Sequence, residues 1–168
     1  MQLSYTKEQI RALSALQDHC EIDSVTLQSC SATRAKAGVA FTEPFSARPA
    51  LSNVASSMQG QYLVAEVSFE YTAWDSSEPP ERLFLVTCTL EVSYRVRDGY
   101  MPTEAERSSF SRGTAVFNCW PYAREFLQDI TARLGHRTPV LPLLRITPKK
   151  SEGAEAAPDP QLASPQSD

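Results

Sequence analysis

The sequence predicts an α+β protein with long antiparallel strands that bury one face. Two long segments, 62–74 and 82–97, alternate apolar and polar residues, as strands with one buried face do. A later segment, 121–134, repeats apolar residues at the spacing of one helix face. With 42% hydrophobic and 21% charged residues, most of the chain is expected to be globular.

The two alternating segments are the clearest elements. Every second residue is apolar from Leu63 to Ala73 and again from Phe84 to Val96, and most of the residues between them are polar. The linker 75–81, which contains two consecutive prolines, is expected to join these strands as a hairpin.

The N-terminal part carries weaker signals. Residues 5–20 predict an amphipathic helix, because Thr6 and Gln9 form a capping box ahead of three spaced apolar residues. Residues 22–34 predict a strand. Between 35 and 60 the pattern is interrupted by prolines and glycine, and only a short edge strand over 50–56 is expected.

After the hairpin the pattern becomes helical. Thr103 and Glu106 form a second capping box and open a short helix, which Gly113 is expected to interrupt. The helix 121–134 is expected to start with Pro121 in its first turn and to end at Gly135.

The segment 138–146 is unusually apolar and contains Pro139 and Pro142. Two prolines in nine residues exclude a helix and argue against a strand in a sheet, so an extended loop is predicted. Such a loop can cover the core or form the wall of a groove for an extended peptide, and the residues alone do not decide between these two roles. We expect one domain over 1–148 and a disordered tail over 149–168, which is rich in alanine, proline, serine and acidic residues.

Composition and motifs exclude several functions. The net charge of −4 without a basic block argues against nucleic-acid binding, and no apolar run approaches the length of a membrane span. Charged residues within the first 18 positions argue against a signal peptide, so a cytoplasmic protein is expected. The four cysteines lack the spacing of a metal or redox site, and no nucleotide-binding or hydrolase motif is present. Glu66 and Glu70 share one strand face and are interpreted as a solvated surface, so we expect no enzyme, metal or cofactor.

A family resemblance rests on the string that runs from Phe117 to Glu125, Phe-Asn-Cys-Trp-Pro-Tyr-Ala-Arg-Glu, followed by a helix and a loop rich in proline and leucine. In this order, after two long strands, the region resembles the signature of SecB chaperones. The resemblance implies an α+β fold in which a four-stranded antiparallel sheet has helices packed on one face. It also implies a homotetramer, built as a dimer of dimers, that binds non-native polypeptide in apolar grooves without ATP. The groove residues implied by matching position are Trp120, Tyr122, Val140, Leu141, Leu143 and Leu144.

The resemblance also bears on partners. Export SecB proteins present acidic residues to the motor SecA, but the corresponding positions here are Gln28, Ala32 and Thr89. We therefore doubt a SecA partnership. The segment 102–106 is more similar to the SecB-like branch that is associated with toxin–antitoxin systems, whose client is an antitoxin. The family's terminal helix is not found after the loop.

The alternative prediction is a hotdog-type thioesterase or a small-ligand-binding α+β domain. A hotdog helix comes before its long strands and is apolar almost all round. Here the best helix follows the strands and keeps polar residues such as Arg124 and Gln128 on one side. The order of the elements therefore favours the chaperone.

Overall fold

The computed structural model describes residues 1–35, 46–135 and 140–149. Residues 150–168 of the expected tail lie outside these ranges. So do residues 138 and 139 of the expected proline-rich loop. The elements are, in order, β1 (Gln2–Tyr5), α1 (Lys7–Gln17), β2 (Cys20–Arg34), β3 (Ser46–Gln59), β4 (Tyr62–Trp74), β5 (Arg82–Val96), α2 (Glu104–Phe110), a π-helical turn (Ser111–Ala115), α3 (Val116–Arg133) and β6 (Arg145–Pro148). None of the described helices is long and apolar enough to cross a membrane.

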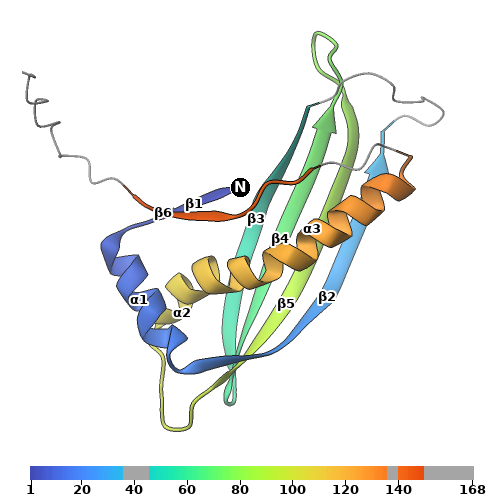
Figure 1. The fold of residues 1–168 in the computed structure, drawn as a ribbon. Helices are drawn as coiled ribbons and strands as arrows, with labels where there is room; N and C mark the ends of the chain where they lie inside the picture. The colour runs from blue at the N-terminus through green and yellow to red at the C-terminus, as the bar shows by residue number, and fades with distance from the viewer. Residues whose placement is uncertain (36–45, 136–139, 150–168) are drawn as a thin grey trace, which may run out of the picture.

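Four long strands form one antiparallel sheet in the order β2-β5-β4-β3, and the helices lie across one of its faces (Figure 1). The α+β architecture expected from the sequence is therefore confirmed. The apolar positions predicted for β4 and β5 are all buried, from Leu63 to Ala73 and from Phe84 to Val96. The opposite face of these two strands carries polar residues, among them Glu66 and Thr89.

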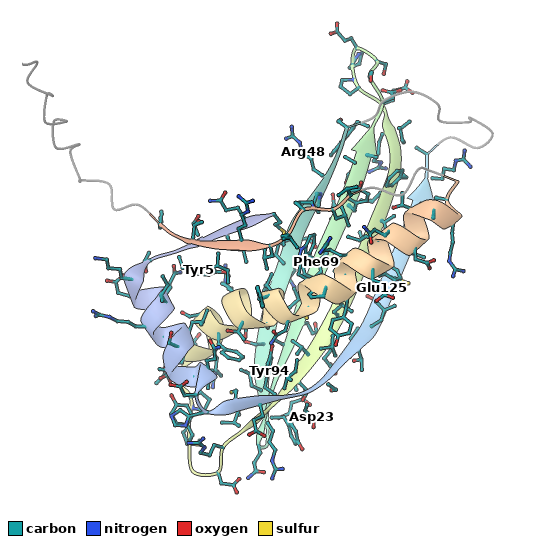
Figure 2. All side chains as sticks on the ribbon, in the orientation of Figure 1. Tyr5, Asp23, Arg48, Phe69, Tyr94 and Glu125 are labelled. Carbon is teal, nitrogen blue, oxygen red and sulfur yellow. The ribbon has the colours of Figure 1, made fainter. Side chains whose placement is uncertain are left out.

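Helix α3 crosses the apolar face of β4 and β5. The Phe69 and Trp120 rings lie 5.5 Å apart between the sheet and the helix, and the Tyr94 ring meets Phe110 edge to face at 4.8 Å. Figure 2 shows Phe69 and Tyr94 on the face of the sheet that the helix crosses. Leu127, farther along α3, is fully buried against the same surface. The core thus sits between the sheet and α3.

Strand β3 is twice as long as the short edge strand expected over 50–56. It pairs with β4 along its full length, from Ser46 opposite Trp74 to Gln59 opposite Tyr62. The backbone ladder to β4 overrides the weak local pattern. Pro49 is tolerated because β3 is an edge strand, where one missing backbone donor does not break a central ladder.

The short helix opened by Thr103 does end before Gly113, at Phe110, but the chain stays helical through the glycine. A π-helical turn joins α2 directly to α3, which begins at Val116 and contains Pro121 in its interior. Gly113 is needed for a different reason: a Cβ at this position would lie 2.1 Å from Leu13 Cδ1 of α1. The glycine lets α1 approach the turn closely. Gly135 has a φ of +82° and caps the end of α3 as expected.

The segment after α3 is not a loop throughout, which corrects a second expectation. Residues Arg145–Pro148 form β6, a strand parallel to β1, with Gln2 opposite Arg145 and Leu3 opposite Ile146. Strand β1 was not expected, because four residues give too short a pattern and the partner lies more than 140 positions away. The two expected capping boxes, Thr6 with Gln9 and Thr103 with Glu106, are both present.

The close packing of α1 on the π-turn gives the first prediction. Gly113→Ala should destabilise the fold by roughly 1–3 kcal/mol in urea unfolding, because an overpacked contact outweighs the better helix propensity of alanine. In a Leu13→Ala background the same change should become neutral or stabilising, because the side chain that it meets is gone. An equal effect of Gly113→Ala in both backgrounds would contradict this packing.

A candidate polypeptide-binding surface

The segment that follows α3 is fixed to the body of the protein at its middle. The indole nitrogen of Trp120 donates a hydrogen bond to the backbone carbonyl of Pro142 at 3.1 Å. Trp120 is only 3% exposed, and so is Leu141, the residue before Pro142. Because a buried indole N–H needs an acceptor, the contact both satisfies Trp120 and holds the segment against the helix. Residues 140–144 are called the crossover segment below.

Exposed apolar side chains recur at every third residue along the crossover segment and into β6. Val140 is 96% exposed, Leu143 68% and Ile146 44%, whereas Leu141 and Leu144 turn towards the core. Val140 and Leu143 lie on the crossover segment, and Ile146 lies in β6, where it pairs with Leu3 of β1. These three residues, named the apolar row here, place apolar side chains at least partly in water.

The apolar row ends at a cavity. It has a volume of about 490 Å³ and lies between α1, the start of β2 and the start of α3. Its lining is mainly apolar and includes Leu13, Ile22, Tyr94, Phe110, Phe117 and Ile146. Ile146 belongs to both features, so the exposed row and the cavity meet at this residue.

The groups in the cavity favour binding over chemistry. Burial raises the pKa of Tyr94, whose hydroxyl accepts a hydrogen bond from the Asn118 side chain at 2.9 Å. Burial also raises the pKa of Cys20 to about 11. Both groups keep their protons at neutral pH, and a protonated thiol is a poor nucleophile. The cavity therefore offers a neutral apolar surface with a few hydrogen-bonding groups.

The six residues expected at the groove fall into three sets. Val140 and Leu143 are exposed on the crossover segment, and Leu144, at the end of the same segment, is half-buried. Trp120 and Leu141 are buried, so they support the segment rather than offer a surface. Tyr122 is exposed, not a core residue, and lies two positions from Trp120, which turns it to another side of α3.

Sequence reasoning missed the residues that line the cavity. Leu13 lies within the first expected helix, and Phe117 opens the string that carries the family resemblance, but nothing local places them together. Ile146 reaches the cavity because β6 pairs with β1, which leads directly into α1. Only that long-range pairing could have shown the site.

The three positions that correspond to the acidic residues of export SecB proteins do not share one surface. Thr89 lies on the polar face of the sheet, and the Gln28 amide donates to a Glu91 carboxylate oxygen at 2.7 Å. Ala32 lies opposite the buried Val86, so it belongs to the helix-covered face instead. Within the described ranges, no three histidine, cysteine or acidic residues come together as a possible metal site.

Taken together, the architecture and this surface define a class: an α+β protein with a four-stranded antiparallel sheet, covered on one face by a long helix and a tethered crossover segment. Comparison with solved structures gives this fold a name. The chain is similar to a SecB-like chaperone of Mycobacterium tuberculosis, solved in complex with a ChAD peptide from the HigA1 antitoxin, with a TM-score of 0.71 and 18% sequence identity. The match covers 82% of this chain and 99% of that one, so the expected SecB-like fold is confirmed.

Other comparisons add little. A protein of unknown function from Streptococcus agalactiae matches with a TM-score of 0.39 and 8% identity, covering 74% of this chain and 97% of that one. No family model and no curated protein matches the sequence.

The opposite exposure of two neighbouring leucines gives the second prediction. Leu141→Ala should lower the free energy of unfolding by roughly 2–4 kcal/mol, because it leaves a cavity beside Trp120. Leu143→Ala should change it by less than about 0.5 kcal/mol, because that side chain is mostly in water. Urea unfolding of both variants measures the difference, and equal losses would show that the crossover segment is not anchored as described.

Proposed function

We propose that this protein is an ATP-independent chaperone that holds non-native polypeptide on its apolar row and in the adjoining cavity. The observation that carries the proposal is the crossover segment, which is tethered by Trp120 and yet exposes Val140 and Leu143. Exposed apolar side chains on an anchored backbone are a preformed surface, so little ordering cost accompanies binding. The absence of nucleotide-binding motifs from the sequence fits a cycle without ATP.

Such a surface suits an extended apolar segment. Burial of apolar area contributes about 25 cal/mol per Å², less the cost of immobilising the client. Several weak contacts along one chain then raise the overall affinity through effective concentration. The cavity at Ile146 offers a pocket for one large side chain, and the row offers shallower contacts.

The nature of the client is suggested by the fold neighbour. The mycobacterial SecB-like chaperone was solved with a peptide from an antitoxin, whereas the positions at which export SecB proteins carry acidic residues are uncharged here. We propose that the main client is a specific apolar segment, such as the tail of an antitoxin, and that SecA is at most a weak partner.

Oligomer formation belongs to the same proposal. Strand β2 is an edge of the sheet, and its helix-side residues Ile22, Leu27 and Cys30 are exposed. An exposed apolar edge is commonly covered by a second chain. These features support a homo-oligomer, with a tetramer as the expected form.

Charges placed on the apolar row test the holding function. The double variant Val140→Asp, Leu143→Asp should suppress aggregation of an unfolded model protein much less well than the unmodified chain, because charged side chains oppose burial of apolar client segments. Light scattering without ATP measures the aggregation. Met101→Asp is the matched control: Met101 is 88% exposed and lies just before α2, outside the row. Equal protection by the double variant and the control would refute the proposed surface, provided that circular dichroism shows both to be folded.

A titration distinguishes the two partners. An apolar antitoxin-tail peptide should bind with at least about tenfold higher affinity than SecA at physiological salt, because Gln28, Ala32 and Thr89 lack the charges with which export SecB proteins steer a basic partner. Isothermal titration calorimetry of both ligands against the same preparation measures the affinities. Submicromolar binding of SecA would contradict the proposal and would indicate a role in general protein export.

A further inference from the structure

A second, polar cavity lies on the other side of α2, where it faces edge strand β3. It has a volume of about 220 Å³. Its polar lining consists of Ser56, Glu104, Arg107, Ser108, Ser111 and Arg112. The last five follow the spacing i, i+3, i+4, i+7, i+8, so they form a single helical face.

That face is polar and partly open to solvent beside the edge of the sheet. Val54 and Ser56 share the helix side of β3, since they pair with the buried residues Val67 and Ala65 of β4. On the helix, Ser111 is buried and Arg107 half-buried, whereas Glu104, Ser108 and Arg112 are exposed. The cavity is therefore lined by two arginines and three serines with a single carboxylate.

Three of these groups lack partners within the described part of the chain. Neither the Arg107 nor the Arg112 guanidinium makes an ion pair or a hydrogen bond there. The Ser111 side chain is 1% exposed, and its hydroxyl has no hydrogen-bond partner. Buried polar groups are nearly always hydrogen-bonded in folded proteins, so the Ser111 hydroxyl is available to donate to a group that enters the cavity.

The backbone that carries these groups is well fixed. The Tyr5 hydroxyl donates to the Arg112 carbonyl, which ties the π-turn to the end of β1. Figure 2 shows Tyr5 beside the helices at this end of the sheet. At the other end of α2, the Thr103–Glu106 capping box orders the first turn. The backbone on both sides of the cavity is thus fixed before any ligand arrives.

We propose that this cavity binds a phosphate group. Guanidinium groups donate paired hydrogen bonds to phosphate oxygens, and serine hydroxyls donate to the remaining ones. The lining carries two arginines against one carboxylate, that of Glu104, so its charge suits an anion rather than a metal cation. Hydroxyl donors come from Ser56 of β3 as well as from Ser108 and Ser111, which gives the several donors that the oxygens of a phosphate can accept. The proposal does not rest on the client-holding function, because none of these residues belongs to the apolar row or its cavity.

Calorimetric titration with inorganic phosphate and with O-phosphoserine, at constant ionic strength, tests the site. Saturable binding is expected for the unmodified chain. Arg107→Gln and Arg112→Gln should each weaken it by at least about tenfold, the effect of losing a charged hydrogen bond. Arg95→Gln is the matched control, because it removes the same charge from the exposed opposite face of the sheet and should leave the affinity unchanged. Tighter binding of phosphoserine would identify an esterified ligand, and equal affinities would identify free phosphate.

Two further variants separate binding from structure. Ser111→Ala should weaken phosphate binding without loss of stability in urea unfolding, because it removes a hydroxyl that has no partner in the free protein. Glu104→Gln should strengthen binding, because it removes the acidic residue of the lining. No saturable binding by the unmodified chain, or the same loss in Arg95→Gln as in Arg107→Gln, would overturn the proposal.

Discussion

The apolar face shared by β4 and β5 is the constraint on which the rest of the structure depends. Two adjacent strands expose a continuous hydrophobic surface that only a long helix can cover, and α3 lies across it. Phe69 and Tyr94 mark two places where aromatic contacts fix the position of the helical region on the sheet. Because α3 must begin near one end of the strands and finish near the other, the segment after it has to return over the same face.

The return is what creates the candidate binding surface. Trp120 faces the sheet and still needs an acceptor for its indole N–H, which the carbonyl of Pro142 supplies. Once the segment is fixed at that point, Leu141 packs inward and its neighbours Val140 and Leu143 are forced outward. The contact that completes the core is therefore the same contact that leaves apolar side chains in water, and the proposed function follows from the packing.

The π-helical turn allows two further packing contacts. A π-turn accommodates one more residue than an α-helical turn, which lets both Phe110 and Val116 reach the core although six positions separate them. Gly113 within it leaves room for Leu13, so α1 closes one end of the apolar cavity. The other side of the same helical stretch carries the arginines and serines of the polar cavity. One irregular turn thus borders both candidate sites.

The sequence by itself determined the elements whose signal is local: the alternation of β4 and β5, the two capping boxes, and Gly135 at the end of α3. These follow from side-chain periodicity and backbone chemistry, which act over a few residues. The tertiary structure decided the length of β3, the continuity of α2 with α3, and the pairing of β1 with β6, because each depends on a partner distant in the chain. It also divided the six expected groove residues into buried supports and exposed contacts. Leu141 and Leu143 are the same residue type two positions apart, and only the anchoring of the backbone by Trp120 determines which of them faces the core.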